Sequence, residues 1–514
     1  MQRVFAGLGL KGIAAVDVAK VGLLFVAIFS GRYSFDRVLD ESSRMPILEI
    51  RYWSLAALVA VIALAPRGAS PVPLLPDRNG RWLLIGIVVF HLYLLANLLV
   101  IGNPAVRAVE AANLAVIVII VALTPLVVRA RPQVVVFALF GEALGMALFA
   151  LALAGLGNPD LNGLGWAPLG GPITFYRVEF MAACCALFFI LDDRLEAKAS
   201  LWHWAVFATT LFSALASLSK AATLGAFVAV GALVFVLFAR GRIRLGVGLA
   251  TSTAVVFAAF FWFNQELIER RLAVAAVSTQ PPASLVARNL LAERARQAGA
   301  PTVAAREMFA DIGSPEAVLA RIYAGEDVTL ATVSPEERAM IEAYRVLIGH
   351  ALPRPDQDLR AFLEGASAYL LVPDGSDRLR MAIGALGYLH SAPWVGVGLG
   401  NALYPAVDRN RDRIDLYYYP HNIFLEQLAV GGIAGFLLFA VPALGALLLI
   451  VRRTLFSDAS LSFLAYLVFV VVTASLSGNY FDFRLFWVVA LVGAVAGQSE
   501  ARTPTTGSGP RARS

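Results

Sequence analysis

Long uninterrupted apolar runs dominate this chain and restrict what it can fold into. Of its 514 residues, 59% are hydrophobic and only 15% are charged. The apolar runs repeatedly reach about 18 residues or more, the length that crosses a bilayer as a helix. Lipid offers the backbone no hydrogen-bond partner, so only helices and closed barrels cross it, and these runs lack the polar alternation of barrel strands. The sequence therefore predicts an all-α integral membrane protein.

About twelve transmembrane helices are expected by the length criterion. The spans lie near residues 12–30, 51–66, 82–101, 108–127, 134–155, 173–191, 201–216, 221–239, 244–263, 422–450, 459–477 and 483–498. Most Lys and Arg fall in the inner loops if the N-terminus is cytoplasmic, so the positive-inside rule places both termini there. This topology explains the net charge of +6. No basic face interleaved with aromatic residues is present, so we expect no nucleic-acid partner.

One long segment, residues 264–421, interrupts the spans and falls on the outer face. The stretches SPEAVLARI and SPEERAMIEAYRVLIGHAL within it each begin with Ser-Pro and acidic residues, as helix starts do. Ser334 and Glu337 also have the spacing of a capping box. We expect four parts: nine transmembrane helices in residues 1–263, this helical outer loop, three helices in 422–498, and a disordered cytoplasmic tail, 499–514.

Ionisable side chains gather near the outer ends of the expected spans. The set comprises Glu110, Arg177, Glu179, His421, Glu426, Asp482 and Arg484, with Lys220 in the outer turn SLSKAA. Such groups cost free energy inside a bilayer and mark sites or structural pairs. Any one of them could reach the membrane surface by snorkelling. Both signs of charge on so many helices favour a shared polar cavity.

The stretch YYYPHNIFLEQLAVGGIAG opens a span with a histidine. If the helix includes His421, its face carries Leu425, Leu428, Gly432 and Gly435. Gly431 and Gly435 form a GxxxG pair that lets a neighbouring backbone approach closely. Pro420 suits the first turn, and the N–H groups of a helix start attract anions. The alternative for His421 is an interfacial histidine bonded to water.

The segment upstream of this helix is rich in glycine. In PWVGVGLGN, the backbone amides of Gly396, Gly398 and Gly400 can face an anion, or the segment is a plain turn that re-enters the membrane. No strand precedes it, so a dinucleotide site is not indicated. Before it, DRLRMAIGALGYLHS predicts a helix on the membrane surface that begins with Arg378 and Arg380.

Several other polar residues favour structural roles. Asp17 and Lys20 are three residues apart on one helical face and can pair. His91 and Glu142 lie nearer the membrane centre, where a hydrogen bond between helices is the favoured role and a proton relay the alternative. The adjacent cysteines 184–185 lack metal-site spacing and predict small core residues. No zinc, P-loop or Ser-His-Asp signature is present, and we expect no cofactor.

At YYYPHNIFLEQLAVGGIAGFLLF the sequence resembles the O-antigen ligase and polysaccharide polymerase family of bacterial envelopes. The family pattern H-N-x-x-L…G-x-x-G places its histidine and glycine at His421 and Gly432. SLSKAATLGAFV resembles the family's S-x-S-[RK] turn, with Lys220 in place of the commoner Arg. RLRMAIGALGYLHSAPWVGVGLGN resembles its Arg-led helix and P-x-x-G-x-G-x-G loop. The likeness covers roughly residues 205–498 as ordered pieces.

The resemblance implies a membrane glycosyltransferase of the bacterial inner membrane. Such enzymes transfer a glycan from an undecaprenyl-diphosphate donor to a hydroxyl on the periplasmic face, without nucleotide or metal. Ligases use lipid A–core as acceptor, and polymerases use another lipid-linked glycan. By motif, His421 would assist the acceptor. The implied diphosphate-binding residues are Lys220, Arg380, Arg177 and Arg378, and the supporting residues are Glu179, Glu426, Gly396, Gly398, Gly400, Asn422 and Gly432.

Two other functions remain open from the sequence. A metal-dependent polyprenyl-phosphate-sugar glycosyltransferase would use Asp36, Asp40 or Glu41 of the first outer loop, which otherwise form a solvated loop. A transporter or lipid-linked-oligosaccharide flippase also suits about twelve spans. The clustering of charge at the outer ends, rather than at the midplane, disfavours transport.

Overall fold

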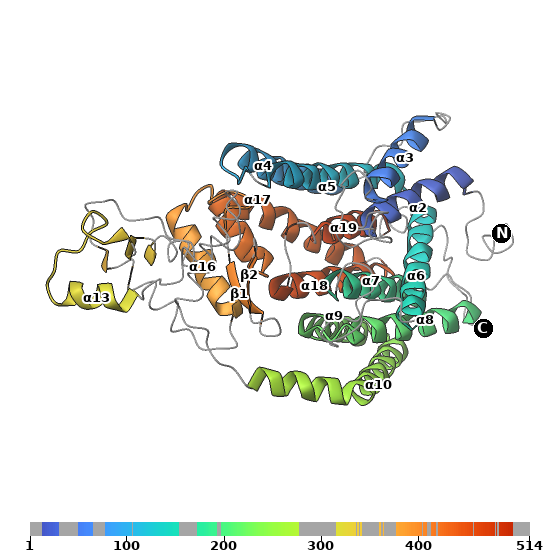
Figure 1. Ribbon diagram of the computed structural model, residues 1–514. Helices are drawn as coiled ribbons and strands as arrows, with labels where there is room; N and C mark the ends of the chain where they lie inside the picture. The colour runs from blue at the N-terminus through green and yellow to red at the C-terminus, as the bar shows by residue number, and fades with distance from the viewer. Residues whose placement is uncertain are drawn as a thin grey trace, which may run out of the picture.

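The computed structural model describes most of the expected membrane region and part of the outer loop (Figure 1). The described residues are 13–29, 50–64, 78–104, 106–153, 172–192, 197–276, 315–335, 337–338, 340–341, 359–360, 363, 377–402, 404–408, 413–417, 420–455, 457–477, 480 and 483–496. Helices dominate them, as the apolar runs predicted.

A helix occupies each expected span. These helices are α2 (Ala15–Phe29), α3 (Ile50–Leu64), α4 (Arg78–Val100), α5 (Arg107–Val127), α6 (Arg131–Leu153), α7 (Pro172–Leu191), α8 (Ala197–Ala216), α9 (Lys220–Ala239), α10 (Ile243–Ala276), α17 (Ile423–Thr454), α18 (Ser460–Ser477) and α19 (Arg484–Ala496). Among the described residues, 7 helices are long and apolar enough to cross a membrane: α4, α5, α6, α9, α10, α17 and α18. The protein is a multi-pass membrane protein, and the full number of spans stays a prediction.

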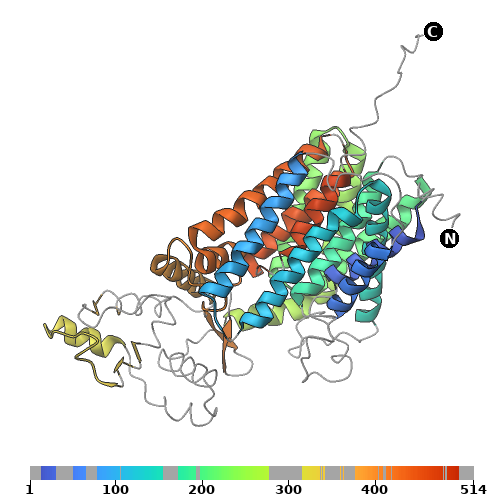
Figure 2. The ribbon, with the colours of Figure 1, turned by 90° about the horizontal axis from the view of Figure 1, so that it is seen from above.

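The helices pack side by side around α18 and α19 (Figure 2). α18 contacts α7, α9, α17 and α19. Every residue of α19 is buried, as expected of a helix that is apolar on all sides. Trp487 of α19 packs against Phe90, Phe439 and Phe483. On the outside of the bundle Trp262 is 79% exposed, and a surface of such side chains suits contact with lipid.

The elements between α10 and α17 gather at one end of the bundle. α16 (Asp377–Ser391) packs on α17, and a hairpin of β1 (Tyr404–Asp408) and β2 (Arg413–Tyr417) lies beside it. The strands are antiparallel, with Tyr404 opposite Tyr417. α13 (Pro315–Tyr323) stands apart from the bundle at this end in both views (Figures 1 and 2). The hairpin shows that the prediction of an all-α protein was wrong in this segment. Its two strands were not predicted because they are too short, and too close to the glycine-rich segment, to show a clear alternation of apolar and polar residues.

The outer loop contains the expected capping box. The backbone N–H of Ser334 donates to Glu337 Oε2 over 2.9 Å, and the N–H of Glu337 donates to Ser334 Oγ over 3.1 Å. Arg321 of α13 donates to the same carboxylate over 2.8 Å. Burial raises the pKa of Glu337, but the Ser334 N–H and Arg321 outweigh it and lower this pKa below its usual value. The capping prediction is confirmed.

The predicted structural pairs are confirmed with one exception. Lys20 Nζ lies 3.8 Å from Asp17 Oδ1. Glu142 of α6 pairs with His203 of α8, with 2.6 Å between Oε1 and Nδ1, so its predicted bond between helices is confirmed. For His91 the prediction is wrong, because its Nδ1 bonds the carbonyl of residue 87 in its own helix over 2.8 Å. The cysteines 184–185 are free thiols in the core, as predicted.

Candidate functional site

His421 lies in a strained turn just before α17. Asn422 is the N-cap of the helix, and its Oδ1 accepts hydrogen bonds from the N–H groups of Phe424 (3.0 Å) and Leu425 (3.1 Å). His421 has a φ of 55°, the left-handed region that costs a side chain about 1–3 kcal/mol. It is half-buried. The prediction that His421 begins the helical face is therefore wrong, and the cap and the turn position it instead.

The start of α17 is less open to anions than expected. The side chain of Asn422 already occupies two of its N–H donors. Glu426 places a carboxylate in the first turn, which competes with an anion for the positive end of the helix dipole. The helix start therefore serves to fix the turn around His421, and the predicted anion site there is not supported.

α17 is broken at Gly432, where φ is 63° and ψ is −163°. The break frees the carbonyls of residues 429 and 430 from their helical partners, because the N–H groups of residues 433 and 434 bond elsewhere. The backbone N–H of Val397 donates to the carbonyl of residue 429 over 2.9 Å, and that of Gly398 donates to the carbonyl of residue 430 over 3.1 Å. The carbonyl of the next residue, 431, accepts a hydrogen bond from the hydroxyl of Tyr93 over 2.7 Å. The freed acceptors are thereby satisfied, as the low-dielectric interior requires.

The freed donors after the break are also satisfied. The N–H of Ile433 donates to the carbonyl of Pro393 over 2.8 Å, and the N–H of Ala434 donates to that of Trp394 over 3.1 Å. This exchange brings two backbones together. A Cβ at position 432 would lie 2.5 Å from the carbonyl carbon of Trp394. Gly432 is therefore required by both its φ and the close approach.

The glycines of the loop before α17 serve this packing. Gly396, Gly398 and Gly400 all have positive φ. The N–H of Gly396 donates to the carbonyl of Ala392 over 3.0 Å, and the N–H of Gly398 donates to the carbonyl of Val430 over 3.1 Å. Neither amide is therefore available to an anion. A Cβ at position 396 would lie 2.2 Å from the carbonyl oxygen of Val430. The amides of these two glycines are thus not free to cradle an anion, and the alternative, a plain turn that re-enters the membrane, stays a prediction.

Two asparagines, one near the end of α4 and one in the connection from α4 to α5, hold the same loop. Asn97 donates to the carbonyl of Val395 over 2.9 Å and accepts from the N–H of Leu399 over 3.2 Å. Asn103 donates to the carbonyl of Gly400 over 3.0 Å. Neither asparagine was predicted from the sequence. The available signal was an amide side chain inside the apolar run LLANLLVIGN, where a polar group needs a partner.

A chain of buried and half-buried polar groups joins α17 to α5 and α3. Glu426 accepts a hydrogen bond from the N–H of Tyr480 over 2.8 Å, and the hydroxyl of Tyr480 bonds Glu110. Asn113 donates to the same carboxylate over 3.1 Å and accepts from Arg51 over 2.9 Å. Two of the expected charged residues thus belong to one cluster. They are bonded within packed protein, and the other three members were not predicted.

Arg177, Glu179 and Arg484 are buried between helices. Arg177 is 1% exposed and donates to the carbonyl of Ser477 at the end of α18 over 2.9 Å. Arg484 donates to the carbonyl of Ile28 over 3.3 Å. Glu179 is fully buried against α6. This enclosure argues against direct contact between Arg177 and a diphosphate, and favours a positioning role for all three.

Lys220 is exposed, unlike Arg177 and Arg484, the other predicted cations whose side chains the structure describes. It is the first residue of α9 and follows a tight turn in which Leu218 has a φ of 53°. Leu218 and His421 are the non-glycine residues with positive φ in the described part of the chain. The strained backbone positions therefore fall in the turn before Lys220 and in the turn at His421, and backbone strain of this kind concentrates at functional sites.

Some predicted residues fall outside what the structure describes. Arg378 and Arg380 lie in the first turn of α16, but their side chains are not among the described ones. Asp482 and the first-loop residues Asp36, Asp40 and Glu41 lie outside the described residues. Their roles stay predictions.

Comparison with known proteins identifies one segment. Residues 346–440 match the family model described as O-antigen ligase. The match spans α16, the glycine loop, the hairpin and α17 past its break at Gly432. No curated protein matches the chain. The resemblance seen in the sequence is confirmed for this segment, which contains His421 and the structure that positions it.

Proposed function

From its O-antigen ligase segment, we propose that this protein is a membrane glycosyltransferase of the O-antigen ligase or polymerase type. It transfers a glycan from an undecaprenyl-diphosphate donor to a hydroxyl of lipid A–core or of another glycan, at the periplasmic face and without a metal. The observation that carries this proposal is the turn at His421, which is half-buried, has a φ of 55° and is fixed by a capped helix start.

The reaction needs a base and a group that stabilises the leaving diphosphate. The acceptor oxygen forms a bond to the anomeric carbon while the bond from that carbon to the diphosphate oxygen breaks. The imidazole of His421 takes the acceptor proton as a general base. Negative charge grows on the departing undecaprenyl diphosphate. Lys220 offers a cation at the positive end of α9, which stabilises this charge most in the transition state.

The remaining residues hold these two groups in place. The break at Gly432 and the loop bonded to it fix the position and direction of the first turns of α17. The Glu426–Tyr480 bond anchors the same turn to the end of α18. Placement of this kind matters because small displacements of reacting groups lower rates steeply. Arg177 and Glu179 act at a distance, through the packing of α7.

Transfer in detergent tests the proposal. Purified protein is incubated with an undecaprenyl-diphosphate-linked glycan and EDTA, with lipid A–core added or omitted. Product in EDTA supports the proposal, and a requirement for lipid A–core identifies a ligase rather than a polymerase. Product that appears only with Mn²⁺ and is lost in Asp36→Ala supports the metal-dependent alternative. Absence of product under all conditions contradicts a transferase function for this donor and favours transport.

A further inference from the structure

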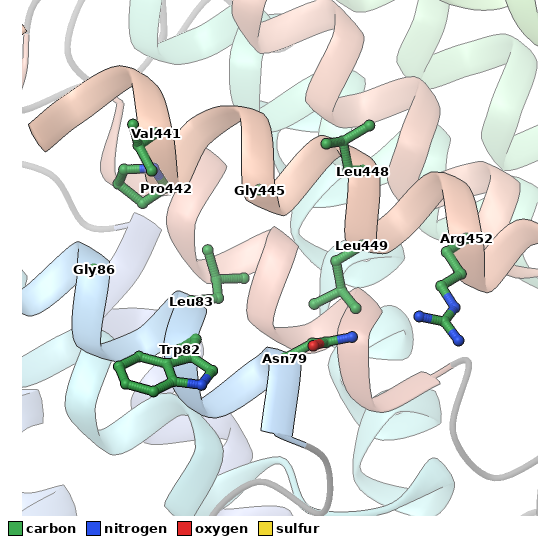
Figure 3. A pocket seen from close by; sticks show the side chains of 10 residues that line it. All are labelled: Asn79, Trp82, Leu83, Gly86, Val441, Pro442, Gly445, Leu448, Leu449 and Arg452. Carbon is green, nitrogen blue, oxygen red and sulfur yellow. The ribbon is translucent and has the colours of Figure 1, made fainter. Parts of the chain in front are cut away.

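A groove runs between α4 and α17 at the end of the bundle remote from α16. It has a volume of about 390 Å³. Trp82, Leu83, Gly86, Val441, Pro442 and Leu449 form most of its apolar wall (Figure 3). Its place follows from the chain direction, because the opposite end of α4 bonds the glycine loop through Asn97. The groove is therefore separate from the site around His421.

The groove exists because small residues and one proline face it. A Cβ at Gly86 would lie 3.2 Å from Pro442 Cβ, so the two helices touch there and close one end. At Gly445 a Cβ would meet nothing within 4 Å, so the middle is open. Leu448 is 60% exposed and Trp82 is also 60% exposed. These side chains face the space that lipid occupies around a membrane protein.

The other end of the groove is polar. Arg452 and Asn79 lie there (Figure 3), and both are exposed. Among the described residues the guanidinium of Arg452 makes no ion pair, whereas Arg242 nearby in the same end of the bundle bonds Asp458 over 2.8 Å. An exposed guanidinium that no carboxylate in the described part of the chain neutralises is suited to a phosphate, which it can bind with two hydrogen bonds.

We propose that this groove binds one anionic phospholipid of the adjacent leaflet, with its phosphate at Arg452 and Asn79 and one acyl chain along Leu449 and Gly445. From residue 452 to residue 442 a helix rises about 15 Å. That is roughly half of the ~30 Å hydrocarbon core, the depth of one leaflet. Length, apolar wall and terminal cation all match such a lipid. This inference does not depend on the proposed transferase function.

Quenching of Trp82 by brominated lipid tests the proposal. The full-length protein is placed in nanodiscs that contain a fixed fraction of dibrominated phosphatidylglycerol or, separately, dibrominated phosphatidylcholine in unlabelled phosphatidylcholine. The contribution of Trp82 is the difference between the protein and its Trp82→Phe variant. Trp262, on α10 and 79% exposed, serves as the reference for ordinary lipid contact through Trp262→Phe.

We expect Trp82 to be half-quenched at a roughly tenfold lower fraction of the anionic lipid, the preference that one charge-assisted contact supplies, while Trp262 shows no preference. Arg452→Gln should abolish the preference and Arg452→Lys should retain part of it. Gly445→Leu should lower quenching by both lipids. Arg244→Gln, an exposed arginine on α10, is the matched control and should change nothing. Equal quenching by the two lipids, or a preference unchanged in Arg452→Gln, would overturn the proposal.

Discussion

Replacing Gly432 by alanine should break the connection between α17 and the glycine loop. The native φ of 63° and ψ of −163° lie in a region that glycine alone adopts readily, and an alanine there costs about 1–3 kcal/mol. The added Cβ would also lie 2.5 Å from the carbonyl carbon of Trp394, a backbone atom that cannot rotate away. Relief of that clash requires the loop to move and the bonds donated by Ile433 and Ala434 to break.

The expected loss of stability is about 2–6 kcal/mol, from the strain and from two hydrogen bonds of about 0.5–1.5 kcal/mol each. It is measured as the shift in the thermal unfolding midpoint of the purified protein in detergent. Gly445→Ala is the matched control, because it lies in the same helix and its Cβ would meet nothing within 4 Å. That variant should be neutral or more stable by up to about 1 kcal/mol.

The rate of glycan transfer should be lower in Gly432→Ala than in Gly445→Ala, as the stability is. Gly432→Ala should lose activity even at temperatures where the protein remains folded, since the turn at His421 is positioned through this break. If Gly432→Ala and Gly445→Ala unfold at the same temperature, the close approach at position 432 does not carry the stability assigned to it. The reasoning from backbone geometry would then be refuted.

Three further predictions concern other contacts. Asn97→Ala should lower the free energy of unfolding by about 1–3 kcal/mol, because it leaves loop groups unsatisfied, and detergent denaturation measures this loss. The pKa of Glu337 is lowered, so its stabilising bonds to Arg321 are fully present above about pH 4.3, the ordinary glutamate pKa, and are lost as the pH falls through the native value. Hydrogen exchange of the adjacent amides, compared with Glu337→Gln at each pH, should show that loss. His203→Ala should destabilise by about 1–3 kcal/mol, since it leaves the buried Glu142 carboxyl group without its hydrogen-bond partner, and Glu142→Leu in the same chain should recover much of the loss.

The helices could be predicted because each is determined locally. An apolar segment in lipid must bond its own backbone, so the run of side chains alone locates the helix. The capping box at Ser334 and Glu337 is equally local, and it was predicted from spacing. The positions of Arg177 and Glu426 near the first turns of α7 and α17 followed in the same way from the limits of the apolar runs.

The break at Gly432 could not be predicted because its partners are distant in sequence. The motif glycines were visible, but an amide cradle and a packed turn give the same pattern until the partners of the amides are known. The contact of Tyr93 with Gly435 could not be predicted for the same reason, because the two residues are distant in sequence. The ring of Tyr93 fills the space beside Gly435, where a Cβ added to the glycine would lie 2.9 Å from Cε1 of Tyr93. The GxxxG pair thus admits an aromatic ring at a position where a neighbouring backbone was expected.

The role of His421 is tested most directly by the rate of glycan transfer in His421→Ala, measured in EDTA with donor and acceptor saturating. His390→Ala is the matched control, because His390 is an exposed histidine at the end of α16 on the same side of the bundle. We predict that His421→Ala lowers the turnover rate by about 10²–10⁴-fold, the contribution of a general base, with an unchanged unfolding midpoint, while His390→Ala retains the native rate. A His421→Ala protein that transfers glycan at the native rate would contradict the assignment of the base.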